Sequence, residues 1–95
     1  MAHLEQVDKT HYKLTGRLDF KTVTAALSQF HALTLDSDIE IDLSDIDRSN
    51  SAGLAMLLQL LSDAKKQNRT VRFTGISEAM IDLAEMSNVK HLLQP

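Results

Sequence analysis

The sequence has no cysteine and no tryptophan, and only one proline and three glycines in 95 residues. Without cysteine there can be no disulfide framework, no thiol nucleophile and no cysteine-based zinc site. The three glycines lie far apart, so they cannot form a phosphate-binding glycine-rich loop or a dinucleotide-binding fingerprint. We therefore expect that the protein does not bind ATP through either motif.

Positive charge is also scarce, because 10 Lys and Arg stand against 13 Asp and Glu and give a net charge of −3. With only four scattered aromatic residues, this balance argues against a nucleic acid partner. The longest apolar run, Ala52–Leu58, is far shorter than the roughly 18 to 20 residues that span a bilayer. Residues 1–8 include acids and no long apolar run, so a secretory signal is not expected. We expect a cytoplasmic protein that meets the inner membrane only peripherally, through a partner.

Candidate metal ligands and catalytic groups do not form a recognisable motif. The histidines are isolated from one another and favour surface or structural roles: His3, His11, His31 and His91. Asp42, Asp45 and Asp47 alternate near the end of an expected strand and could form a carboxylate site, but a solvated strand end and turn explain them as well. We therefore expect no catalytic residue, no cofactor and no metal.

Hydrophobic periodicity predicts the secondary structure. Short strands over residues 4–7 and 11–15 flank a polar turn and suggest a hairpin, which Gly16 ends. Asp19 can cap a helix over about residues 20–33. The further elements are a strand over 39–44, a helix over 52–67, a strand over 70–74 and a helix over 78–87 capped by Ser77. Leu92 and Leu93 are expected to pin the C-terminal tail.

The order β-β-α-β-α-β-α predicts an α/β fold, with a small mixed β-sheet covered by helices and formed by residues 1–95 as a single domain. The last two strands are joined through a helix and should therefore be parallel.

The polar stretch from Asp47 to Ser51 leads directly into the helix over 52–67 and is the most informative part of the sequence. Ser49, Asn50 and Ser51 can each cap the first helical turn, and at least one of them must do so. A hydroxyl at the start of a helix also lies where the helix dipole would accept added negative charge. Ser51 is thus a candidate regulatory position, because a phosphate there would suit the fold but would be felt by a bound partner.

The same helix has more apolar residues than one buried face needs. A stripe at helical spacing accounts for the core: Leu54, Leu57, Leu58, Leu61 and Ala64. Met56 and Leu60 remain on one flank, where they either form an adaptable docking surface or are buried by neighbouring elements.

Three segments together resemble the STAS domain family, which includes the anti-sigma-factor antagonists: the strand Ile39–Ser44, the loop and helix start Asn50–Leu54, and the helix end Ala64–Gln67. The resemblance covers essentially the whole chain and implies the STAS fold. In the antagonists the hydroxyl that matches Ser51 is phosphorylated by a serine kinase that is also the anti-sigma factor. Asn50 and Ala52 depart from the antagonists, which have Asp and a second hydroxyl at these positions.

These departures, together with the helix Gly53–Gln67 and the strand Val71–Gly75, are more similar to the STAS subunit of the bacterial Mla phospholipid-transport ABC complex. That resemblance implies a non-enzymatic accessory subunit that binds the cytoplasmic ATPase subunit and supports its assembly and activity. The expected contacts with the ATPase are Ser49, Asn50, Ser51, Ala52, Met56 and Leu60. The alternative is an anti-sigma-factor antagonist regulated by phosphorylation of Ser51.

Overall fold

The first two strands form the expected hairpin. The computed structural model describes residues 2–33 and 35–93, apart from the side chains of residues 47–49. Strand β1 (His3–Gln6) pairs antiparallel with β2 (His11–Leu18), with Leu4 opposite Leu14. The turn between them is held by the carboxylate of Asp8, whose Oδ1 accepts the N–H groups of Thr10 and His11 at 2.9 Å each.

Strand β2 is longer than the sequence predicted, because it continues through Gly16 to Leu18. Gly16 has a φ of 97°, and the pairing register shifts between Gly16 and the next residue. The two halves of β2 therefore pair with different strands. The first half lies parallel to β3 (Ile39–Asp42), and the second half lies parallel to β4 (Ile46–Ser49).

Strand β4 was not predicted as a separate element, since its sequence is mostly polar and was interpreted as a capping loop. It pairs with Gly16–Leu18 of β2, a part of β2 that β3 leaves unpaired because β3 pairs only with His11–Lys13. The main sheet has the order β1-β2-β3-β5, with β5 spanning Val71–Thr74. Strands β3 and β5 are parallel, as expected, and the sheet as a whole is mixed.

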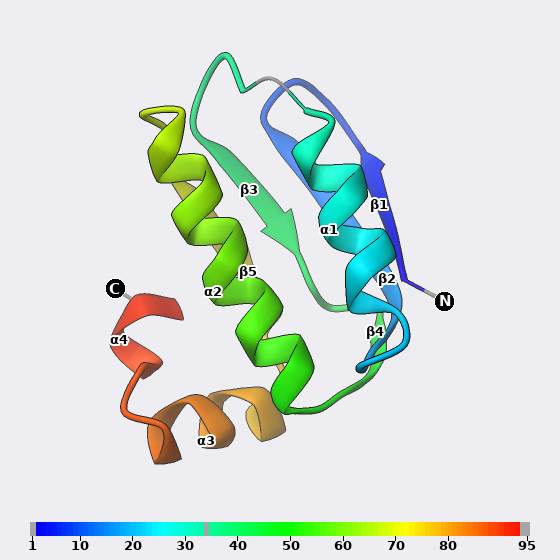
Figure 1. Cartoon of the computed structure of the whole chain (residues 1–95), viewed down its shortest axis with the longest axis vertical. Helices are drawn as coiled ribbons and strands as arrows, with labels where there is room; N and C mark the ends of the chain where they lie inside the picture. The colour runs from blue at the N-terminus through cyan, green and yellow to red at the C-terminus, as the bar shows by residue number, and fades with distance from the viewer. Residues whose placement is uncertain (1, 34, 94–95) are drawn as a thin grey trace.

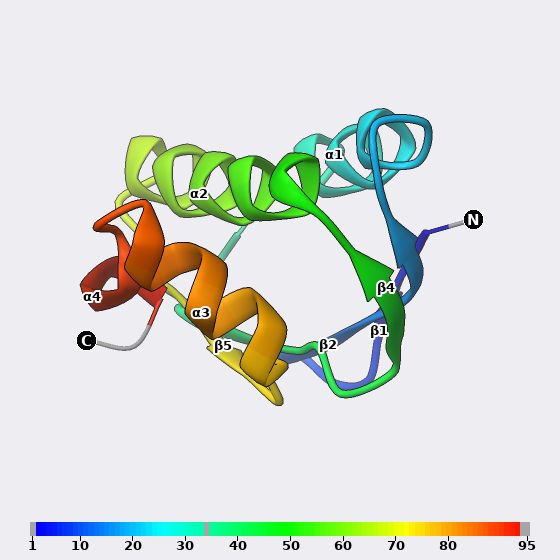
Figure 2. The same ribbon diagram turned by 90° about the horizontal axis from the view of Figure 1, so that it is seen from below.

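Helices α1 (Val23–His31) and α2 (Ser51–Lys66) form a layer over one face of the sheet (Figures 1 and 2). Both run from the lower to the upper part of Figure 1, so they begin at the same end of the molecule. Helix α3 (Glu78–Met86) and the short α4 (Lys90–Leu93) lie to one side, by β5 and α2 (Figure 2). In the part of the chain that the structure describes, no helix has the length and apolar character needed to cross a bilayer.

Capping groups define the ends of these helices. Ser77 caps α3 as expected, with its Oγ accepting the N–H of Met80 at 3.2 Å. Asn68 and Asn88 lie two residues after the ends of α2 and α3, and both have a φ of 60°, the left-handed conformation that commonly follows a helix C-cap. Of the two apolar residues expected to pin the C-terminal tail, Leu93 is buried and Leu92 is 46% exposed.

One continuous hydrophobic core lies between the sheet and the helices. Alternate strand residues point into it, including Tyr12, Leu14, Ile39, Ile41, Val71 and Phe73. Gly75 closes the end of β5 with a φ of 67°, where a Cβ would lie 2.8 Å from the backbone nitrogen of Ser44. A glycine is therefore required by both the backbone conformation and the close approach of the β3–β4 turn.

Candidate interaction site

Asn50 connects β4 to α2 and is the N-cap that the sequence required of at least one residue here. Its extended backbone places the side-chain Oδ1 2.9 Å from the N–H of Ala52, which it accepts. Its own N–H donates to the carbonyl of Leu18 at 3.2 Å, which ties the start of α2 to the end of β2. The position of the helix start is thus fixed by both a side-chain cap and a backbone hydrogen bond.

Ser51 is the first residue of α2, and it is exposed. Because Asn50 already supplies the cap, the hydroxyl of Ser51 is not needed for capping. No acidic residue lies in the first turn of α2, so no negative side chain there offsets the positive end of the helix dipole. This exposed position suits a contact with a partner or a modification of the Ser51 hydroxyl. Both roles of Ser51 stay predictions.

The other residues expected at this site differ in their placement. Ser49 is the last residue of β4, and its side chain lies outside the described part of the structure. Ala52 is buried in the first turn of α2, so it presents little surface to a partner.

The expectation that Met56 and Leu60 form an exposed docking flank is wrong, because each is only 2% exposed. Both belong to the continuous core cluster, so neighbouring elements bury them. Leu58 and Leu61, which were placed in the core stripe, are only partly buried against the cluster. The exposed face of α2 instead carries mostly small and polar side chains: Ser51, Ala55, Gln59, Ser62, Lys65 and Lys66.

A turn that the sequence pattern did not indicate follows Leu18, whose carbonyl accepts the N–H of Asn50 at this helix start. It spans residues 19–22, between β2 and α1, and carries Phe20, whose residue surface is 75% exposed. The helix predicted from about residue 20 therefore begins only at Val23. No signal of this exposure was present in the sequence, since Phe20 lies three residues before Val23 and seven before Leu27, on the same apolar stripe at helical spacing.

The carboxylates proposed as a possible cluster have separate structural partners. Asp42 Oδ1 accepts the N–H of Ser44 at 2.8 Å, and this hydrogen bond lowers the pKa of Asp42. Asp45 forms an ion pair with Lys13 at 2.5 Å, and the side chain of Asp47 lies outside the described part of the structure. A turn and a surface ion pair thus account for the two acids that the structure describes.

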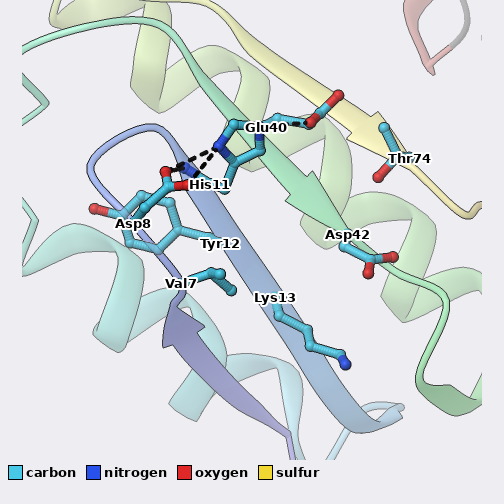
Figure 3. Close-up of a pocket in the computed structure, with 8 residues that line it drawn as sticks. All are labelled: Val7, Asp8, His11, Tyr12, Lys13, Glu40, Asp42 and Thr74. Carbon is cyan, nitrogen blue, oxygen red and sulfur yellow. Dashed lines mark hydrogen bonds and ion pairs between the residues drawn. The ribbon is translucent and has the colours of Figure 1, made fainter.

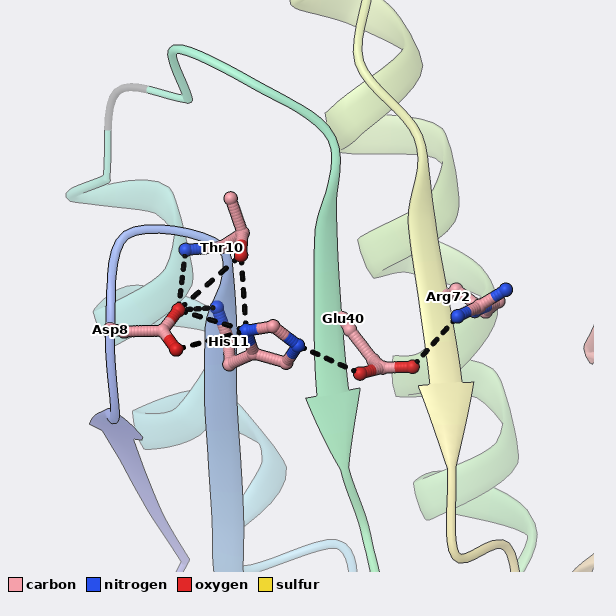
Figure 4. A network of polar contacts seen from close by, with 5 residues as sticks. All are labelled: Asp8, Thr10, His11, Glu40 and Arg72. Carbon is pink, nitrogen blue, oxygen red and sulfur yellow. Dashed lines mark hydrogen bonds and ion pairs between the residues drawn. The ribbon is translucent and has the colours of Figure 1, made fainter.

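The face of the sheet opposite α1 and α2 is polar and contains a shallow pocket of about 540 Å³ (Figure 3). Figure 4 shows that four ionisable side chains, Asp8, His11, Glu40 and Arg72, lie in a row across this face. Asp8 contacts His11 Nδ1 at 2.9 Å, His11 Nε2 lies 3.1 Å from Glu40, and Glu40 lies 3.0 Å from Arg72. Hydrogen bonding to Asp8 is the main reason why the pKa of His11 is raised. The row joins the hairpin turn to β3 and β5, and within the described residues no group of acids and histidines could hold a metal ion.

Comparison with solved structures defines the class of this fold. The crystal structure of an anti-sigma-factor antagonist STAS domain from Rhodobacter sphaeroides matches with a TM-score of 0.63. The match covers 84% of this chain and 94% of the other at 18% sequence identity. The chain therefore has the STAS fold that the sequence predicted: a small α/β unit with a mixed sheet and helices.

Sequence comparison defines the family more closely. The family model described as "Mlab, STAS domain" matches residues 2–94, and the chain belongs to this family. The intermembrane phospholipid transport system binding protein MlaB of Escherichia coli K12 is 34% identical over 76 residues, which is 80% of this chain and 77% of that protein. The protein of the same name from Haemophilus influenzae is 34% identical over 84 residues, with 83% and 80% coverage. The resemblance to the Mla-type STAS domains is thus confirmed.

Proposed function

We propose that this chain is a non-enzymatic accessory subunit of an Mla-type phospholipid-transport ABC complex, acting as a single domain that binds the ATPase subunit. The observation that carries this proposal is the 34% identity to two proteins named as binding proteins of an intermembrane phospholipid transport system. In this proposal the chain meets the inner membrane only through the complex, from the cytoplasmic side. It acts by stabilising the assembled, active state of its partner.

The proposed docking surface is the start of α2, comprising Asn50, Ser51 and the exposed Ala55 one turn later. The cap and the hydrogen bond to Leu18 support this choice, because they hold the helix start in one position before a partner arrives. The small side chains of Ser51 and Ala55 also let a partner surface approach the helix closely. Met56 and Leu60 are not part of this surface.

Affinity isolation of the chain from native cells, followed by mass spectrometry, tests the proposal. The ATPase and permease subunits of an ABC transporter should be recovered with the wild-type protein. Ser51→Glu should fold, helped by the helix dipole, but lose the ATPase, because a carboxylate would be desolvated without a partner in the interface. Ser28→Glu, at an exposed serine of α1, is the matched control and should retain the ATPase.

A second outcome of the same isolation would favour the alternative function. The exposed Ser51 at the start of α2 and the antagonist STAS fold also suit an anti-sigma-factor antagonist. Recovery of a serine kinase with phosphate on Ser51, and no transporter subunit, would replace the accessory-subunit proposal.

A further inference from the structure

The turn that carries Phe20 is held by hydrogen bonds at both of its ends. Asp19 Oδ1 accepts the N–H groups of Lys21 and Thr22, at 2.9 and 3.2 Å. In return, the hydroxyl oxygen of Thr22 accepts the N–H of Asp19 at 3.0 Å, and its O–H donates to the carbonyl of Arg17. Phe20 makes none of these bonds, so any residue could occupy its position in the turn. An apolar side chain is nevertheless held there in solvent, on a rigid loop.

The strand end that leads into this turn is hydrogen-bonded to the residue that precedes α2. Phe20 follows Leu18 by two residues, and the carbonyl of Leu18 accepts the N–H of Asn50 at 3.2 Å. In the register of the parallel strands, Leu18 is also paired with Ser49. The chain therefore leaves β2 toward Phe20 and leaves β4 toward Ser51 from neighbouring positions.

We propose that Phe20 is the apolar anchor of the docking surface and inserts into an apolar pocket on the protein partner. The inference rests on the proposed function, and it adds the side chain that supplies most of the contact. A buried aromatic residue on a rigid support is the usual source of binding energy at the centre of an interface, because few rotamers are lost when it binds. Asn50 and Ser51 then contribute the polar border beside it.

Charge specifies the pocket further. Although the chain is negative overall, Lys21 is exposed next to Phe20. Helices α1 and α2 both begin at this end, and neither has an acid in its first turn. At the start of α1 the carboxylate of Asp19 already accepts two N–H groups, so the positive groups that remain near this turn are Lys21 and the start of α2. A pocket bordered by carboxylates is the complementary surface.

The test measures binding of the purified chain to the ATPase subunit of the Mla-type transporter from the same organism, by titration calorimetry. Phe20→Ala should weaken the affinity by about 30-fold or more, as expected for a central aromatic anchor. Met86→Ala is the matched control, because Met86 is 84% exposed on α3 and should bind within about twofold of wild type. Both variants should melt close to the wild-type temperature, since neither side chain is buried. Lys21→Glu should weaken the affinity at low salt, with the difference shrinking at high salt.

The possible failures can be told apart. If Phe20→Ala binds like wild type while Ser51→Glu does not, the anchor is wrong and the docking surface stands. If wild type does not bind the ATPase, the proposed function itself fails. Phe20-dependent sedimentation with vesicles of phosphatidylethanolamine and phosphatidylglycerol would assign the side chain to a membrane surface. Phe20-dependent dimerisation in sedimentation velocity would assign it to a second copy, and either result would overturn the proposal.

Discussion

The imidazole Nε2 of His31, at the end of α1, lies 2.5 Å from a carboxylate oxygen of Asp63 on α2. The other oxygen of Asp63 accepts a hydrogen bond from Gln59 at 2.9 Å. Burial alone would raise the pKa of Asp63, but the hydrogen bonds from Gln59 and His31 outweigh it, and the pKa is lowered. The two helices are thus joined near their C-terminal ends, away from the candidate docking surface at their start.

Replacement of Asp63 by Asn should lower the free energy of unfolding by about 1 kcal/mol at pH 7. Because the folded pKa of Asp63 is lowered, its contribution is present above the ordinary value of 3.8 and is lost as the pH falls through the folded pKa. Urea unfolding at several pH values measures this difference, which should shrink toward acid. Asp82→Asn, at an exposed acid of α3, is the control. A difference that does not change with pH would mean that the carboxylate charge is not responsible.

His11 should stabilise the sheet over a defined range of pH. The folded pKa of His11 is raised, so its contribution is complete below the ordinary value of 6.5 and is lost as the pH rises through the folded pKa. The pKa of Asp8 is lowered, mainly by the backbone hydrogen bond from Thr10, so its part is present above 3.8 and is lost toward acid. His11→Gln should therefore lower the melting temperature most near pH 5, which lies between the ordinary pKa values of Asp8 and His11, and least near pH 9. His3→Gln, the same substitution on the same hairpin, is the control.

Gly75→Ala should destabilise the fold by about 1 to 3 kcal/mol, because an alanine would adopt a positive φ there. The new Cβ would also lie 2.9 Å from Asp42 Oδ1 and 2.8 Å from the backbone nitrogen of Ser44. Removing the carboxylate should give little rescue, since the backbone atom cannot turn aside. Equilibrium unfolding of Gly75→Ala, Asp42→Ala and the double variant tests this, and full recovery in the double variant would contradict it.

Met56→Asp and Leu60→Asp should each destabilise the protein by about 3 kcal/mol or more, because each buries an unpaired charge in the core. Gln59→Asp, at an exposed position of the same helix, should unfold at nearly the wild-type urea concentration. Circular dichroism during urea unfolding makes the comparison. Stable, folded aspartate variants would show that these side chains can leave the core.

The local pattern of the sequence was sufficient for the elements with strong periodicity. The predicted β5, α2 and α3 agree with the structure within one residue at each end. Strand β4 could not be predicted in this way, because its pairing depends on a register shift at Gly16 in a distant strand. A strand with the sequence Ile46–Ser49 has no apolar alternation to indicate it.

The buried side of α2 was predicted only in part, for a related reason. The spacing of leucines marked a stripe through Leu54 and Leu57, which are indeed buried. The full width of the buried face depends on where α1 and α3 pack against α2, and this brings Met56 into the core while leaving Leu58 at its edge. For the candidate site, the sequence identified Ser51 and the capping segment but missed Phe20, because only the folded chain bonds Leu18, which precedes the 19–22 turn, to Asn50 at the start of α2.

The hydrogen bonds at the edge of the sheet affect how the protein meets other copies of itself. Strand β1 is an edge strand, and Gln29 of α1 reaches over to accept the N–H of Leu4 at 2.8 Å. An edge donor that already has a partner is a poor template for an incoming strand. One glutamine side chain thus discourages growth of the sheet from chain to chain along this edge, a protection against aggregation in a crowded cell.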